Sequence, residues 1–92
     1  MMEANIIVHG RVQGVCFRMY AQEEAQKLGI TGWVRNRRDQ TVEICAQGDP
    51  LDIEKFISWC HQGSPYAQVT QVEVEKTKPK KILRNFDIVA ST

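Results

Sequence analysis

A chain of 92 residues suits one domain with a single two-layer core, and we expect residues 1–92 to form that domain. Its 12 basic and 11 acidic residues leave a formal net charge of +1, which argues against an extended nucleic-acid interface. No apolar run approaches the roughly 20 residues that a membrane span requires, and the first residues lack the pattern of a signal peptide. The three cysteines are far apart, so we expect reduced thiols, no metal site and a cytoplasmic protein.

A glycine-containing loop separates the first predicted strand from the first predicted helix. Residues 4–12 are apolar and rich in β-branched side chains, which predicts a strand. Residues 17–28 carry apolar side chains at helical spacing, which predicts an amphipathic helix, and a glycine suited to a helix end follows them. The loop between the two, residues 11–16, is bracketed by Gly10 and Gly14, which favour turns.

Two strands joined by a short turn follow. Residues 32–38 and 41–47 both have the composition of strands, and apolar side chains alternate with polar ones in the second. This alternation predicts one buried face. The turn, Asp39 and Gln40, is too short for a crossover connection, so the two strands should pair antiparallel.

The second helix has start and end signals. Asp49 can cap its N-terminus, and Pro50 suits its first position because the first helical amides have no acceptor within the helix. Gly63 can end the helix. Its apolar side chains at helical spacing predict a buried stripe of Ile53, Phe56, Ile57 and Cys60.

The last third of the chain predicts two more strands. Residues 66–75 form the fourth strand, and their apolar positions change phase near Thr70 and Gln71, which indicates a β-bulge. A basic, proline-containing connection leads from residue 76 to a short last strand marked by Phe86 and Ile88. Nothing in the pattern places this last strand within the sheet.

The order strand, helix, strand, strand, helix, strand predicts an α+β fold. It is the order of the ferredoxin-like βαββαβ sandwich, here with a short extra C-terminal strand. Each helix has one apolar stripe, so both should cover the same face of a mostly antiparallel sheet. Many functions occur on this fold, so the function must be argued from a site.

The loop after the first strand has the features of an anion site. The first amides of a helix have no acceptor within the helix, and the helix dipole favours negative charge there. Gly14 allows successive amides to converge, and Arg18, in the first helical turn, can hold two phosphate oxygens with its forked guanidinium. The same residues also fit an ordinary strand-to-helix turn with a surface arginine. The loop lacks the Gly-Lys-Ser/Thr ending of a Walker loop.

Two segments resemble the signatures of a known family. Residues 8–18, Val-His-Gly-Arg-Val-Gln-Gly-Val-Cys-Phe-Arg, match every defining position of the first acylphosphatase signature. Residues 32–36, Gly-Trp-Val-Arg-Asn, resemble the second signature, which continues correctly to Val42 and Gly48. The likeness covers nearly the whole chain, including residues 63–65 and the closing Phe-x-Ile.

The resemblance implies hydrolysis of the carboxyl–phosphate bond of acyl phosphates, a ferredoxin-like fold and no cofactor. It implies that Arg18 binds the phosphate and that Asn36 positions the attacking water. The implied phosphate-binding loop consists of Gln13, Gly14, Val15, Cys16, Phe17 and Arg18. We expect direct attack of this water on phosphorus, with inorganic phosphate or sulfate as a competing anion. We also expect a monomer without a membrane or nucleic-acid partner.

Several residues invite a separate interpretation. Gln40 stands where the family usually has a glycine, so the turn must be of another type or the backbone must be strained. Cys16 is separated from Arg18 by one residue, whereas cysteine-dependent phosphatases place five residues between the two, so we do not expect Cys16 to be a nucleophile. Trp33 and Trp59 could pack in the core or line a rim, and core packing is the preferred interpretation.

Three other functions fit parts of the pattern. A non-catalytic anion-binding or regulatory module would use the same loop without turnover, and an acyl phosphate assay separates it from an enzyme. RNA binding on this fold needs exposed aromatic side chains on the central strands, where the sequence places none. An accessory domain of a larger maturation enzyme is the third. No zinc-finger segment or linker accompanies the domain, so we expect a free-standing enzyme.

Overall fold

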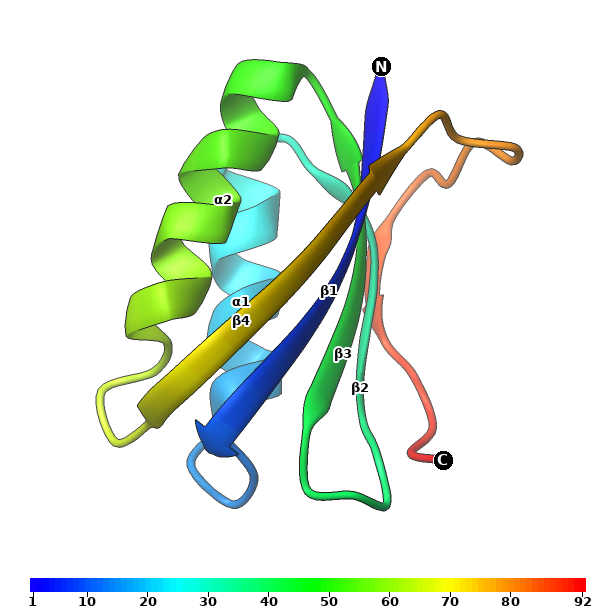
Figure 1. Cartoon of the computed structure of the whole chain (residues 1–92). Coiled ribbons are helices and arrows are strands. Elements are labelled where there is room, and N and C mark those ends of the chain that lie inside the picture. The colour runs from blue at the N-terminus through cyan, green and yellow to red at the C-terminus, as the bar shows by residue number, and fades with distance from the viewer.

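The computed structural model describes every residue from 1 to 92. Its elements, in chain order, are β1 (Met2–Arg11), α1 (Phe17–Lys27), β2 (Thr31–Asn36), β3 (Val42–Gly48), α2 (Pro50–Gln62), β4 (Gln68–Thr77) and β5 (Phe86–Ile88). The five strands form one sheet, and both helices lie against one of its faces (Figure 1). The predicted ferredoxin-like sandwich and its element order are confirmed.

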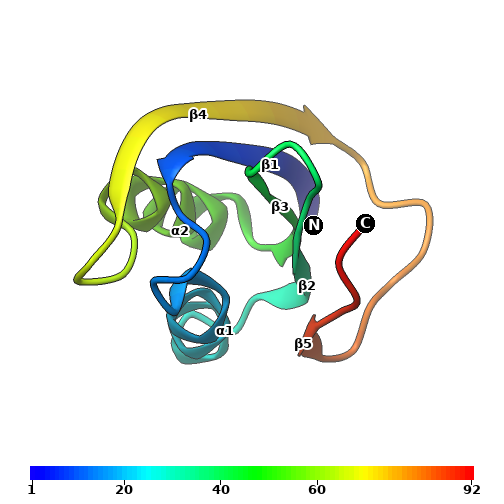
Figure 2. The same ribbon diagram turned by 90° about the horizontal axis from the view of Figure 1, so that it is seen from below.

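The sheet is antiparallel except at one edge. Its strand order is β4-β1-β3-β2-β5, and the first four of these strands pair antiparallel with their neighbours. The last strand, β5, pairs parallel with β2, with Gly32 opposite Phe86 and Val34 opposite Ile88. Figure 2 shows β4 and β5 at opposite edges of the sheet, joined by the long connection. The tertiary structure thus supplies the position of β5 that the sequence left open.

The predicted β-bulge lies in β4. His9 pairs with Gln71, whereas the next residue of β1, Gly10, pairs with Val69, so Thr70 is the extra residue. Because a bulge adds one residue to one strand of a pair, it explains why the apolar positions of β4 change phase at this point. The prediction is confirmed.

The turn between β2 and β3 keeps a left-handed residue without using glycine. Gln40 has a φ of 74°, a conformation that costs a non-glycine residue roughly 1–2 kcal/mol. The preceding Asp39 carboxylate stabilises the turn, because it accepts hydrogen bonds from the hydroxyl (2.5 Å) and the amide (3.1 Å) of Thr41. Both bonds lower the pKa of Asp39, and the bond from the Thr41 hydroxyl has the larger effect. Of the two solutions that the sequence allowed, the chain uses the strained backbone.

The second helix begins and ends where the sequence predicted, and the first ends at Lys27, one residue earlier than predicted. The Asp49 carboxylate accepts a hydrogen bond from the Leu51 amide (3.1 Å), Pro50 is the first residue of α2, and Gly63 ends it with a φ of 73°. The buried residues of α2 are Ile53, Phe56 and Cys60. Neither helix of the chain is long and apolar enough to cross a membrane.

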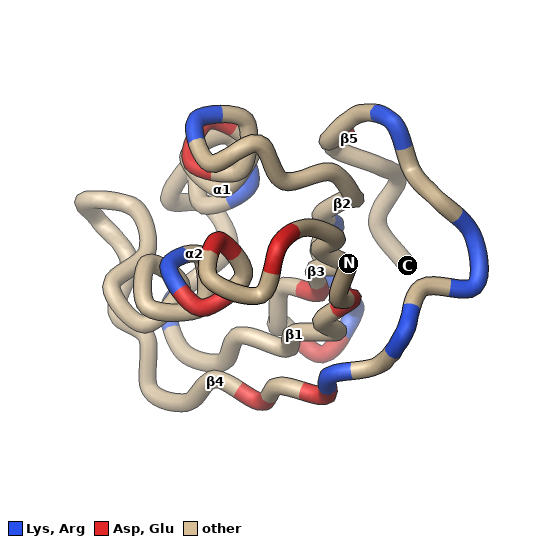
Figure 3. The backbone as a smooth tube through the Cα atoms, turned by 90° about the horizontal axis from the view of Figure 1, so that it is seen from above, with Lys and Arg blue, Asp and Glu red and all other residues tan.

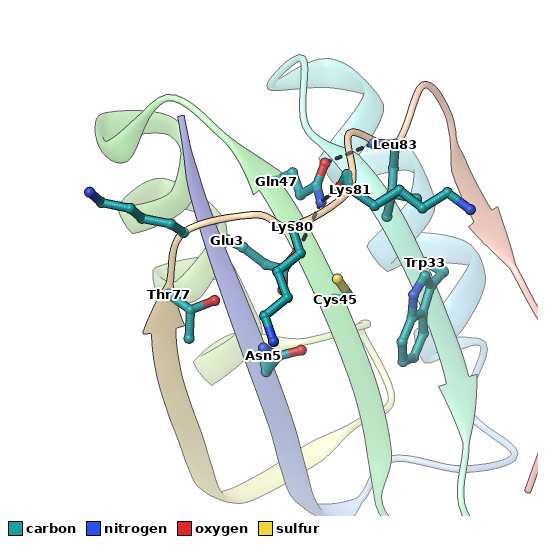
Figure 4. A pocket seen from close by; sticks show the side chains of 10 residues that line it. Glu3, Asn5, Trp33, Cys45, Gln47, Thr77, Lys80, Lys81 and Leu83 are labelled. Carbon is teal, nitrogen blue, oxygen red and sulfur yellow. Dashed lines mark hydrogen bonds between the residues drawn. The ribbon is translucent and has the colours of Figure 1, made fainter.

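The core fills the space between the helices and the sheet. The rings of Trp59 and Phe56 stack with centroids 5.9 Å apart, and Trp59 also meets Phe17 at 5.3 Å. Core packing of Trp59 is therefore confirmed. For Trp33 the same prediction is wrong, because successive strand residues alternate between faces and Val34 takes the buried position in β2. Trp33 lies on the helix-free face of the sheet (Figure 4).

One buried side chain fastens the connection between β4 and β5 to the helix-free face. Gln47 is 1% exposed, and its amide nitrogen donates to the Lys81 carbonyl (2.6 Å) and to the Glu3 carboxylate (2.8 Å). Its amide oxygen accepts from the Leu83 amide (2.9 Å). Every polar atom of this side chain therefore has a partner within the protein.

A cavity of about 460 Å³ remains beneath this connection, on the helix-free face. Figure 3 shows basic residues spaced along the connection, but in the close view only Lys80 extends down toward Asn5, whereas Lys81 points outward (Figure 3, Figure 4). Cys45 lies in the floor, where burial raises the pKa of its thiol to about 11. A thiol with so high a pKa stays protonated and unreactive at neutral pH.

Candidate active site

The loop between β1 and α1 curls at two residues with left-handed backbone. Gly14 has a φ of 74°, and Cys16 has a φ of 61° although it carries a side chain. Such residues let successive amides converge on one point. No hydrogen bond within the protein uses the amides of residues 13–18 as donors. These amides are therefore free to bind an anion at the N-terminus of α1.

Two side chains hold this loop in place. The amide nitrogen of Gln13 donates to the carbonyls of Arg37 (2.8 Å) and Thr41 (2.9 Å), at the two ends of the β2–β3 turn. On the other side, the hydroxyl of Ser64, which is 2% exposed, donates to the Val15 carbonyl (2.7 Å). The loop is thus fixed from both sides, so its amides need little reordering when an anion binds.

Sequence reasoning missed both contacts. It placed Gln13 in the loop through its amide only, and it gave Ser64 no role. The partners of Gln13 lie 24 and 28 positions away, and that of Ser64 lies 49 positions away. No local pattern could reveal them, because each bond exists only once the sheet and α2 have assembled.

A cavity of about 430 Å³ opens beside the loop. Its lining includes four of the predicted loop residues and the predicted asparagine: Gly14, Cys16, Phe17, Arg18 and Asn36. The fold therefore brings together residues from α1, the preceding loop and the end of β2. Two predicted loop residues do not line the cavity: Val15 is buried, and the Gln13 side chain faces the β2–β3 turn.

Arg18 has no ionic partner within the protein. The five ion pairs of the chain do not include it, whereas Arg35 pairs with Glu43 (2.7 Å) and Arg37 pairs with Asp39 (3.6 Å). Arg18 therefore presents a half-buried guanidinium to the cavity with all its donors available. No aspartate, glutamate or histidine lines the same cavity, so nothing in it competes with an anion for this cation.

Asn36 brings an unpaired acceptor to the cavity. It is the last residue of β2, and its backbone carbonyl accepts a hydrogen bond from the Thr92 amide (3.1 Å). Its side-chain oxygen Oδ1 is buried and has no hydrogen-bond partner, and it is the only buried side-chain polar atom of the chain in that state. An unpaired buried acceptor costs roughly 1–3 kcal/mol. A donor that arrives with a ligand or a water would recover that free energy.

Cys16 lines the cavity with an exposed, free thiol. No imidazole or carboxylate in the cavity could take its proton. A base within hydrogen-bond reach is one way in which a nucleophilic cysteine is activated. The cavity therefore offers Cys16 no general base.

Fold and site together define a class of protein: a ferredoxin-like sandwich in which unpaired amides, a guanidinium without an ionic partner and an unpaired carboxamide oxygen line one cavity. The acylphosphatase family model matches residues 4–88 of this chain. An acylphosphatase from Thermococcus kodakarensis is 49% identical over 88 residues, which are 96% of each chain. One from Shewanella amazonensis is 47% identical over 91 residues, which are 99% of this chain and 100% of the other.

A solved structure agrees with these relatives. The crystal structure of acylphosphatase from Bacillus subtilis matches with a TM-score of 0.94 and 42% identity, over 97% of this chain and 99% of the other. The chain belongs to the acylphosphatase family, and the resemblance of its two signatures is confirmed. It is therefore an enzyme, and the reaction of its family is hydrolysis of acyl phosphates.

Proposed function

We propose that this chain cleaves the carboxyl–phosphate bond by direct attack of a water held by Asn36, with the phosphate bound by Arg18 and the amides of residues 13–18. The observation that carries the proposal is the buried, unpaired Oδ1 of Asn36 in the same cavity as Arg18. A carboxamide oxygen without a donor is suited to a water, because the water can donate one hydrogen and keep a lone pair for attack.

The phosphate end of the substrate matches the loop. The Arg18 guanidinium can grip two phosphate oxygens, and the free amides of residues 13–18 converge on the remaining charge. Each hydrogen bond to a charged group contributes roughly 1.5–3 kcal/mol. Because Gln13 and Ser64 already hold the loop, these donors are in place before the transition state forms.

The reaction needs no general base from the protein. The water oxygen bonds to phosphorus, the bond from phosphorus to the acyl oxygen breaks, and the carboxylate leaves with the electron pair. One water proton passes to a phosphate oxygen, so the products are a carboxylate and inorganic phosphate. A carboxylate is a good leaving group, so positioning and charge stabilisation carry the catalysis. The cavity lining, which holds no carboxylate or imidazole, fits this scheme.

The first test is turnover of acetyl phosphate with the wild type and Arg18→Lys. The substitution keeps the positive charge but removes the guanidinium, which can donate to two phosphate oxygens at once. We therefore expect kcat/KM to fall by roughly 10²-fold or more. Arg38→Lys is the matched control, because Arg38 is exposed and takes no part in an ion pair. We expect a chelator to leave turnover unchanged and inorganic phosphate or sulfate to inhibit competitively.

Two results would overturn the proposal. If Arg18→Lys keeps the wild-type kcat/KM, the guanidinium of Arg18 is not needed to bind two phosphate oxygens. Tight binding of inorganic phosphate by the wild type, without any turnover of acetyl phosphate, would instead support the non-catalytic anion-binding module.

A further inference from the structure

The cavity beside the loop has an apolar half that the phosphate does not need. Met19 and Ile88 line it and remain 46% and 41% exposed, next to the buried side chains of Val12 and Phe17. They are two of the seven large apolar side chains that the chain exposes. Exposed apolar side chains that gather at one cavity, rather than singly over the surface, mark a place where an apolar group binds.

The sheet register places Ile88 beside Asn36. Ile88 is the partner of Val34 in the parallel β2–β5 pair, and the Val89 amide donates to the Val34 carbonyl (3.0 Å). Asn36 follows Val34 by two residues, so their side chains leave the same face of the sheet. Ile88 therefore stands on the face that carries the Asn36 carboxamide.

A hydrogen bond between α1 and β5 places Met19 opposite Ile88. The side-chain nitrogen of Gln22 donates to the Phe86 carbonyl (2.9 Å), so this side of α1 faces β5. Met19 lies three positions before Gln22 and thus on the same side of the helix. The two apolar side chains come from different elements, and the Gln22 bond holds those elements together.

We propose that Met19 and Ile88 form the acyl subsite, which selects acyl phosphates whose acyl group is a bulky hydrocarbon, aromatic or branched. This inference rests on the proposed function, because it assumes that the phosphate lies on the loop. The cavity then mirrors the substrate: Arg18, Asn36 and the loop amides meet the charged end, and Met19 and Ile88 meet the hydrocarbon end. A volume of about 430 Å³ is large for a phosphate alone and lies within the range of small-molecule sites.

The test compares kcat/KM for benzoyl phosphate with kcat/KM for acetyl phosphate. We expect the wild type to prefer benzoyl phosphate. Met19→Gln and Ile88→Thr each remove apolar surface while keeping a helix former and a β-branched residue, respectively. One buried methylene contributes about 0.8 kcal/mol, which is about fourfold in kcat/KM, so each variant should lower the benzoyl-to-acetyl ratio by roughly four- to tenfold. The kcat/KM for acetyl phosphate should fall less, because the methyl group of this substrate contacts little of the surface of Met19 and Ile88.

Matched controls separate a subsite from a general surface effect. Leu51→Gln and Ile82→Thr make the same exchanges at residues that are 74% and 60% exposed and lie outside the cavity, so the ratio should stay within about twofold of the wild type. Met19→Leu restores an apolar side chain and should restore the ratio.

The result that overturns the inference is a benzoyl-to-acetyl ratio that stays within twofold of the wild type in both Met19→Gln and Ile88→Thr. A ratio that falls equally in the Leu51→Gln and Ile82→Thr controls would overturn it as well. Both results are distinct from failure of the proposed function, which would appear as Arg18→Lys turning over acetyl phosphate at the wild-type rate.

Discussion

Two of the four cavities of the chain have similar volumes, about 430 Å³ beside the β1–α1 loop and about 460 Å³ on the helix-free face, and their buried side-chain polar atoms are in opposite states. In the second cavity, Gln47 satisfies Glu3, Lys81 and Leu83 within the protein. In the first, the oxygen of Asn36 has no partner. By size alone, the cavity on the helix-free face would be the preferred candidate site. The unpaired acceptor of Asn36 instead favours the cavity beside the loop.

The difference has a physical reason. A hydrogen bond made within the protein contributes to the free energy of folding, as at Gln47, and is then unavailable to a ligand. A buried acceptor left unpaired is a cost to the folded protein that a bound molecule can remove. Removing the unpaired acceptor should therefore change catalytic activity, whereas removing the paired side chain should change the free energy of unfolding.

The largest effect is expected for Asn36→Ala. Under the proposed mechanism, loss of the water acceptor should lower kcat for acetyl phosphate by roughly 10²–10³-fold and change KM much less, because the proposed phosphate site consists of Arg18 and the loop. Asn5→Ala makes the same exchange in the cavity on the helix-free face and should leave kcat within about twofold. Steady-state kinetics of both variants measures the contrast. Near-normal kcat in Asn36→Ala would disprove the water-positioning role.

Gln47→Leu should produce the opposite outcome at the other cavity. It leaves the Lys81 carbonyl and the Leu83 amide without their partner, so the free energy of unfolding should fall by about 1–3 kcal/mol. Turnover of the folded variant should stay near the wild-type value. Urea unfolding provides the measurement, with the exposed Gln68→Leu as the matched control. A stable variant with impaired turnover would contradict the assignment of a structural role.

The smallest effect is expected at the β2–β3 turn. Gln40→Gly removes the left-handed strain at a φ of 74° but adds flexibility to the unfolded chain, so a net gain of roughly 0.5–1 kcal/mol is expected. Gln40→Ala keeps the strain and should give no such gain. Thermal unfolding of the two variants decides the question. Equal melting temperatures for both would show that Asp39 and Thr41 already relieve the turn.

Local patterns in the sequence were enough to predict most of the fold. The spacing of apolar residues in α1 and α2, the cap at Asp49 and the phase change at Thr70 all depend on neighbours a few positions away. The first helical turn likewise puts Arg18 beside the amides of its own loop. These features follow from backbone geometry that any short segment carries with it, which is why they could be predicted without knowledge of the whole.

Only the tertiary structure decided the rest. It placed β5 parallel to β2, moved Trp33 to the helix-free face, joined Gln13 to the β2–β3 turn and set Ile88 across from Met19. Each of these depends on which distant segments pair, and the pairing is selected by burial summed over the whole sheet and both helices. The loop between β1 and α1 is thus encoded within one short stretch of sequence, while the cavity beside it forms from residues that meet only when the entire chain has folded.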